Sequence, residues 1–145
     1  MRKLTDRKGV AAVEFALVLP ILLVLVFGII EFSLVLFDKQ IITNASREGA
    51  RLGIVAPSGT PPVRKTDAEI IAAVKLYADN HLISLGSGVN TVTFPPSTIT
   101  RAGTNFGDNL TVTVQYDYKF LVLTKFISSI TGVKTLTATT VMKME

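Results

Sequence analysis

The order of apolar and polar positions predicts one long helix with two different halves. Nearly every position from 10 to 37 is apolar, and the stretch 15–30 has no charged side chain. Beyond Asp38, apolar and small residues recur at steps of three and four, the spacing of one helix face: Ile41, Ala45, Gly49 and Leu52. We therefore expect a continuous helix from about Val10 to about Val55, apolar all round in its first half and amphipathic in its second.

The chain after this helix begins with a linker and a second helix. Residues 56–66 are rich in Pro, Gly and Ser, which is typical of a connecting segment. Thr66 followed by Glu69 is a capping box, in which each side chain satisfies a backbone N–H of the other residue. Apolar residues then follow at helical spacing. We expect a helix over 67–83.

Alternation of apolar and polar side chains predicts strands in the rest. It is strict over 110–120 and returns in the tail from Leu136 to Met144, and a short β-rich run at 89–94 ends at two prolines. We expect a loop over 100–109 and a short helical turn over 123–132. The fold class is thus α+β: one helix packed on a roughly three-stranded antiparallel sheet in a small domain, 67–145.

Length and flanking charge indicate a membrane anchor. The apolar run 10–37 exceeds the roughly 20 residues that span a bilayer. Residues 1–9 contain four basic residues and one acidic residue, whereas the far side begins with the balanced pair Asp38 and Lys39. Positive charge stays on the cytoplasmic side. We therefore expect a cytoplasmic N-terminus, a helix extension outside the membrane at 38–55 and an extracytoplasmic domain.

Composition gives no indication of an enzyme. The chain has no cysteine and a single histidine, His81, and its sequence contains no catalytic triad pattern, zinc-binding motif or nucleotide-binding loop. The net charge of +4 comes mostly from residues 1–9, so it does not indicate nucleic-acid binding. We predict no catalytic residue, no metal, no cofactor and no small-molecule substrate.

The N-terminal third resembles a known group of proteins. The start "KGVAAVEF" places Glu14 fifth from Val10, directly after Gly9, as in prepilins; "LPIL" contains Pro20, and "GIIEF" and "ASREGAR" follow further along. Over about residues 7–55 the chain resembles TadE-like proteins, minor pilins or pseudopilins of the Tad (Flp) pilus system. Phe15 stands where major Flp pilins typically have Tyr, and those pilins are much shorter, so the resemblance favours a minor component.

This resemblance implies an assembly role. Residues 1–9 would be a leader that a prepilin peptidase removes between Gly9 and Val10, with Gly9 interrupting the helix. Glu14 would then meet the N-terminal amine of a neighbouring subunit, and Pro20 would loosen the helix for extraction from the membrane. The implied partners are other pilins and minor pilins, the peptidase, the assembly ATPase and the platform proteins, in a bacterial inner membrane.

Other interpretations stay open from sequence alone. The chain is also compatible with an uncleaved anchor carrying a binding domain, with Glu14 near the lipid headgroups, or with a type II secretion pseudopilin. We expect Glu31 at the outer membrane boundary. The small residues pack against the chain's own sheet or, alternatively, against another helix: Ala45, Gly49 and Gly53. The charged residues form a solvated face or a partner contact: Arg47, Glu48 and Arg51.

Overall fold

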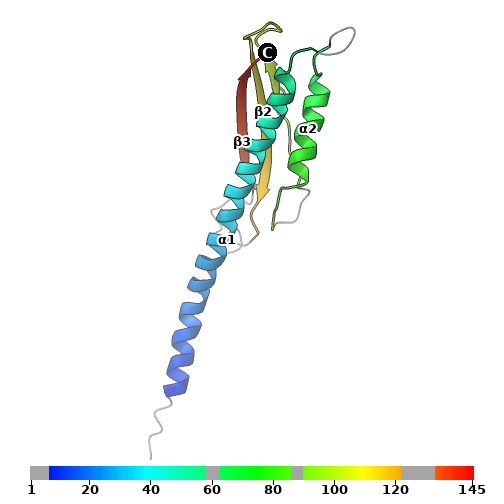
Figure 1. The fold of residues 1–145 in the computed structure, drawn as a ribbon. Helices are drawn as coiled ribbons and strands as arrows, with labels where there is room; N and C mark the ends of the chain where they lie inside the picture. The colour runs from blue at the N-terminus through cyan, green and yellow to red at the C-terminus, as the bar shows by residue number, and fades with distance from the viewer. Residues whose placement is uncertain (1–6, 58–62, 86–89, 122–132) are drawn as a thin grey trace, which may run out of the picture.

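One long helix carries a small α+β domain on its C-terminal half. The computed structural model describes residues 7–57, 63–85, 90–121 and 133–145. Helix α1 spans Arg7–Ile54. Its first half projects alone as a rod, and its second half lies alongside the other elements (Figure 1). The predicted continuous helix is thus confirmed, with its end one residue before Val55.

Helix α1 also runs through Gly9, so the expectation that this glycine interrupts the helix is wrong for the uncleaved chain. The helix begins at Arg7. A glycine inside a helix costs only about 1 kcal/mol relative to alanine, which the long flanking stretch of helix formers readily offsets. Gly9 therefore weakens the first turns without ending them.

Helix α2 spans Asp67–Asp79 and starts as predicted. Thr66 Oγ1 accepts from the Glu69 N–H at 3.3 Å, and Glu69 Oε2 accepts from the Thr66 N–H at 2.8 Å, which completes the capping box. The helix ends four residues before the predicted Ile83. The Ile83 N–H, which the predicted helix would bond to a carbonyl one turn back, donates instead to the Asp38 side chain at 3.0 Å.

The sheet has three antiparallel strands in the order β1-β2-β3. They are β1 (Ile99–Arg101), β2 (Asn109–Lys119) and β3 (Val133–Lys143). The predicted alternation holds along β2 and β3. The side chains directed toward the helices that are buried in these two strands are Leu110, Val112, Val114, Tyr116, Tyr118, Leu136 and Ala138. The α+β architecture predicted from the sequence is confirmed.

The prediction of a strand over 89–94 is wrong. Within its described part, 90–94, only Thr93 pairs with the sheet, as an isolated bridge to Gln115. The chain then turns at Pro95, whose carbonyl accepts from the N–H and the hydroxyl of Thr98. The strand therefore forms later, at 99–101, inside the region expected to start a loop. The helical turn expected over 123–132 lies outside the described residues.

The core lies where α1 passes between α2 and the sheet. A Cβ on Gly49 would lie 2.4 Å from Val74 Cγ2 of α2, and one on Gly53 would lie 2.4 Å from Leu110 Cδ2 of β2. Ala45, one turn earlier on the same stripe, is fully buried. The small residues thus let α1 approach both neighbours closely. Their contacts are with the chain's own helix and sheet.

Replacing Gly49 by Ala is expected to destabilise the domain by about 1–3 kcal/mol, as overpacked core positions do. Val74 is β-branched and held at χ1 by its helix, so it cannot easily move away from the new methyl group. Urea unfolding of the detergent-solubilised chain measures this. Arg47→Ala, on an exposed position of the same helix, is the control and should stay within about 0.5 kcal/mol. Equal stability of the two variants would contradict the packing argument.

Candidate functional site along the long helix

The projecting half of α1 is an exposed apolar rod. No side chain between residues 9 and 30 is buried. Helix Gly9–Ile54 contains an 18-residue stretch with a mean hydropathy of 2.8, of which none is buried. In the described part of the chain it is the one helix long and apolar enough to cross a membrane. Exposed apolar surface on this scale suggests membrane anchoring.

Glu14 lies on this rod and is exposed. It lies four positions after Val10, so the two residues lie about 6 Å apart along the helix axis on one face. Cleavage of the Gly9–Val10 bond would create an amine one turn before the carboxylate, at the N-terminal end of the same helix. Glu14 is exposed on the helix surface, and the pairing with a neighbouring subunit that the resemblance implies stays a prediction.

Pro20 lies inside α1 without ending it. Proline has no N–H, so the carbonyl of Ala16 lacks the hydrogen bond that a helix normally supplies there. An apolar hollow of about 370 Å³ lies beside it, lined by Pro20, Ile21, Val24 and Leu25. At Pro20 the helix therefore has one backbone hydrogen bond fewer than a regular helix would have.

Two carboxylates of α1 are buried where the domain begins. Glu31 and Asp38 are both 0% exposed. Glu31 Oε1 accepts from the Leu121 N–H at 2.5 Å, and Asp38 Oδ1 accepts from the Ile83 N–H at 3.0 Å. These side chains fasten the segments that follow α2 and β2 to the long helix. Within the described side chains, Glu31 is the first buried residue of α1, and its place at the outer membrane boundary stays a prediction.

Asp38 carries an energetic cost. Burial raises its pKa to about 6, although the hydrogen bond from Ile83 opposes that rise. Asp38 Oδ2 and Tyr118 Oη are buried atoms that no described group hydrogen-bonds. Burial, followed by the charges of Glu31 and Asp38, raises the pKa of Tyr118 to about 12. The base of the domain thus holds an acidic side chain that gives up its proton less readily than an ordinary aspartate does.

The sequence contains a pattern that indicates both buried acids. Glu31, Asp38 and Ala45 follow one another at steps of seven, which is two helical turns, so they share one face. The same face continues through Gly49 and Gly53 into the core. The buried stripe therefore begins at Glu31, two turns before the start of the predicted amphipathic half.

The charged residues on the outer side of α1 lie away from this stripe. Arg51 Nε lies 3.2 Å from Glu48 Oε2; the Arg51 side chain is largely exposed and that of Glu48 about half exposed. Arg47 is exposed as well. An exposed pair of this kind contributes about 0–1 kcal/mol. In the single chain, Glu48 and Arg51 pair with each other and Arg47 is exposed, and the alternative of a partner contact stays open.

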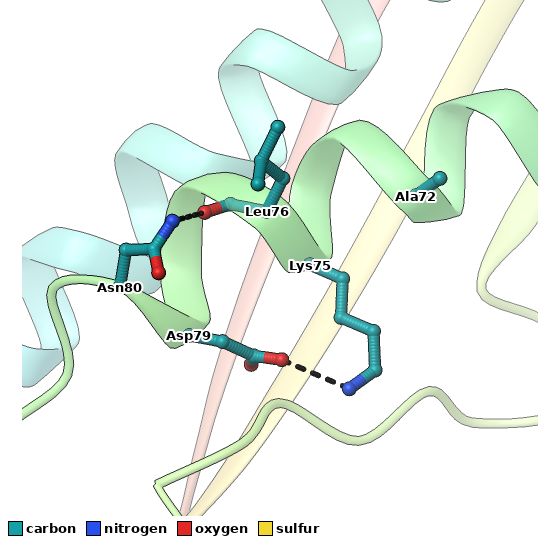
Figure 2. Close-up of a pocket in the computed structure, with 5 residues that line it drawn as sticks. All are labelled: Ala72, Lys75, Leu76, Asp79 and Asn80. Carbon is teal, nitrogen blue, oxygen red and sulfur yellow. Dashed lines mark hydrogen bonds and ion pairs between the residues drawn. The ribbon is translucent and has the colours of Figure 1, made fainter.

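A second hollow, of about 410 Å³, lies on the outer face of α2. Figure 2 shows its lining side chains, which come from the last turns of the helix: Ala72, Lys75, Leu76, Asp79 and Asn80. Lys75 pairs with Asp79 at 2.9 Å, and the Asn80 amide donates to the Leu76 carbonyl. Its polar groups therefore satisfy one another. Within the described ranges no group of His, Cys, Asp and Glu residues could hold a metal ion.

Comparison with known proteins gives one match. The sequence profile of the family described as TadE-like protein matches residues 9–51. The resemblance found in the sequence is confirmed over this stretch, which runs from Gly9 to Arg51 and includes Glu14, Pro20 and both buried acids. No curated protein matches this chain, and no solved structure does.

Proposed function

We propose that this chain is a minor pilin or pseudopilin that takes part in the assembly or priming of a Tad-type pilus. The observation that carries the proposal is that the family match and the features expected of a prepilin helix fall on the same residues. The TadE-like match over 9–51 covers an exposed apolar half-helix that begins at a Gly9–Val10 bond and carries Glu14 one turn later. A helix of this kind can serve as a membrane anchor before assembly and as a packing rod after it.

The proposed membrane span is 10–30, shorter than the apolar run 10–37 of the sequence. From Glu31 onward one face of α1 is buried in the domain, so the bilayer cannot surround it there. Twenty-one helical residues extend about 31 Å, which matches the roughly 30 Å of a hydrocarbon core. The exposed apolar residues beyond this point then lie at the membrane surface: Phe32, Leu36 and Phe37.

The proposed topology follows the charges. The basic residues of 1–9 stay in the cytoplasm, and the domain lies outside the bacterial inner membrane. A prepilin peptidase would cut after Gly9 at the cytoplasmic face. The bond lies within the first turns of α1, so the peptidase has to unwind these turns first. Glycine lowers the cost of that unwinding, because it is a poor helix former and leaves room beside the bond.

The proposed partners follow from the two ends of α1. The apolar half packs against the corresponding helices of other pilins or minor pilins, and the cytoplasmic leader meets the peptidase and the assembly platform with its ATPase. In a dry bundle of helices a buried carboxylate is costly unless it is paired. The new amine of Val10 on a neighbouring subunit supplies the partner for Glu14, and the pair fixes the axial register between subunits.

Blocking the cut tests this function. Replacing Gly9 by Leu is expected to leave the chain in the membrane with residues 1–9 attached and to remove it from the sheared pilus fraction, because the peptidase loses the small residue beside the bond. Gel mobility and mass of the chain report processing. Gly28→Leu, the same change inside the apolar run, is the control and should be processed normally. Normal processing of the Gly9 variant would contradict the proposed cleavage site.

A further inference from the structure

Strand β3 forms one edge of the sheet, and its outward backbone groups can be assigned residue by residue. The N–H groups of Thr113 and Gln115 donate to the β1 side of β2, so the odd-numbered residues of β2 face that side. The even-numbered residues of β2 then bond β3, and register pairs them with even-numbered residues there. Between the end residues of β3, the backbone N–H and C=O groups that point away from the sheet belong to four residues: Thr135, Thr137, Thr139 and Val141.

This edge lacks most of the features that protect edge strands from pairing. Strand β3 is eleven residues long, contains no proline and pairs with β2 one residue to one without a bulge. No charged side chain occurs between Lys134 and Lys143. The opposite edge is well protected, since β1 has only three residues and follows two prolines. No strand in the described ranges pairs with the outer side of β3.

A symmetric pair of copies does not fit this edge in a membrane. Two identical strands related by a twofold axis pair antiparallel. Strand β3 runs in the same direction as α1, because Ser46 contacts Thr140 and Ile54 contacts Glu145 further along both elements (Figure 1). Antiparallel pairing would therefore point the two apolar rods in opposite directions. This step rests on anchoring both copies in one membrane, as proposed above.

The charges beside the edge indicate the chemistry of the occupant. The Lys39 ammonium of α1 donates to the outward carbonyl of Thr137, and exposed lysines 134 and 143 lie near the two ends of β3. The nearest carboxylate on β2, Asp117, already accepts from the Thr135 hydroxyl at 2.6 Å. We propose that the open edge of β3 binds an extended, acidic segment of a different polypeptide, which adds to the sheet as a fourth strand.

The roles of the two chains follow from this geometry. The backbone of the added segment bonds to the four outward residues of β3. Its carboxylates lie near the lysines at the middle and the ends of the edge, where Lys39 exchanges a carbonyl for a charged partner. The three-stranded sheet would become a four-stranded one. The packing of α1 on the face of the sheet would not change.

Residue-level amide hydrogen exchange on the full-length chain in lipid nanodiscs tests the proposal. The probes are two nine-residue synthetic peptides of alternating Thr and Val, one with Asp and one with Lys at three of the Thr positions. In the free chain, the amides of Thr135, Thr137 and Thr139 should exchange faster than those of Leu136 and Ala138. The Asp peptide at about 1 mM should slow the fast set at least about tenfold, and the Lys peptide should bind about tenfold more weakly.

Two variants separate strand addition from other binding. Thr139→Pro removes one outward N–H, and an edge strand tolerates proline when that N–H faces away from the sheet. It should weaken binding of the Asp peptide at least about tenfold while the even-numbered amides stay protected. Thr139→Val keeps the N–H and should bind as the parent does. Outward amides already protected in the free chain, no protection by the Asp peptide, or equal binding by both variants would each overturn the proposal. Equal binding of the two peptides would overturn its acidic preference.

Discussion

Glu14→Gln is expected to lower incorporation of the chain into sheared pili by more than about tenfold, which corresponds to a loss of roughly 1.4 kcal/mol or more. The side chain is exposed on the apolar rod, where a charged group needs a partner once lipid or other helices surround it. Glutamine keeps the size and removes the charge, so the pair with the amine of Val10 cannot form. Immunoblots of the pilus and membrane fractions measure the share of the chain that is incorporated into pili.

The comparison needs a carboxylate of the same helix with no role in assembly. Glu48 provides it, because it pairs with Arg51 on a solvated face. Glu48→Gln should be incorporated as the parent is. The Glu14 variant should still insert in the membrane and lose residues 1–9, which separates an assembly defect from a processing defect. Undiminished incorporation of Glu14→Gln would rule out the charge pair.

The second large effect concerns stability. Asp38→Asn is expected to stabilise the domain at pH 7.5 by about 1 kcal/mol: removing the charge gains up to about 3 kcal/mol, because the folded pKa of about 6 exceeds the ordinary 3.8, and the new amide donor, at a buried position without a described partner, costs part of that gain. At that pH the folded chain holds a buried carboxylate in its charged form. Asparagine keeps the Oδ1 acceptor for the Ile83 N–H and removes the charge. Urea unfolding at several pH values measures the gain.

The pH dependence has a defined sign. Because the pKa of Asp38 is higher in the folded chain, that chain holds its proton more tightly between pH 3.8 and about 6, and stability falls as pH rises through this window. Glu69 acts in the opposite sense. Its hydrogen bonds to Lys65 and Thr66 lower its pKa from 4.5 to about 2, so its stabilisation is lost as pH falls through that range. Stability should be greatest near pH 4–5.

In the Asp38→Asn variant, stability should no longer fall as pH rises above about 4. The loss of stability below that pH, which comes from Glu69, should be unchanged. Asp117→Asn, a change at an exposed carboxylate of β2, should leave the fall in place. If the parent chain were equally stable at pH 4.5 and pH 7.5, the buried charge would carry no cost, and the account of the domain base would fail.

Much of the fold could be predicted because local patterns agree with the tertiary structure. The helical periodicity of α1, the capping box of α2 and the alternation in β2 and β3 each depend on neighbouring residues alone. The Gly9, Val10 and Glu14 spacing was likewise visible in the sequence, as was the matched stretch 9–51. These elements needed no knowledge of what packs against them.

The features that sequence analysis missed depend on contacts between distant segments. Helix α2 ends before the predicted Ile83, whose N–H donates to Asp38, 45 residues away. Glu31 is buried and accepts from the backbone N–H of Leu121, 90 residues away. The early strand was placed at 89–94 because Pro95 looked like the end of a strand, whereas it precedes one. A polar residue on a buried helix face indicates a hydrogen bond to a distant segment. The seven-residue steps from Glu31 to Asp38 and Ala45 place both acids on that face.

The most direct measurement is the N-terminal sequence and intact mass of the chain purified from its native membrane. A chain that begins at Val10 is the predicted result, and it would give Glu14 an amine to pair with on a neighbouring subunit. A chain that still begins at Met1, in cells whose peptidase processes the main pilin, would contradict the account. The protein would then be an uncleaved anchor that carries an extracytoplasmic binding domain.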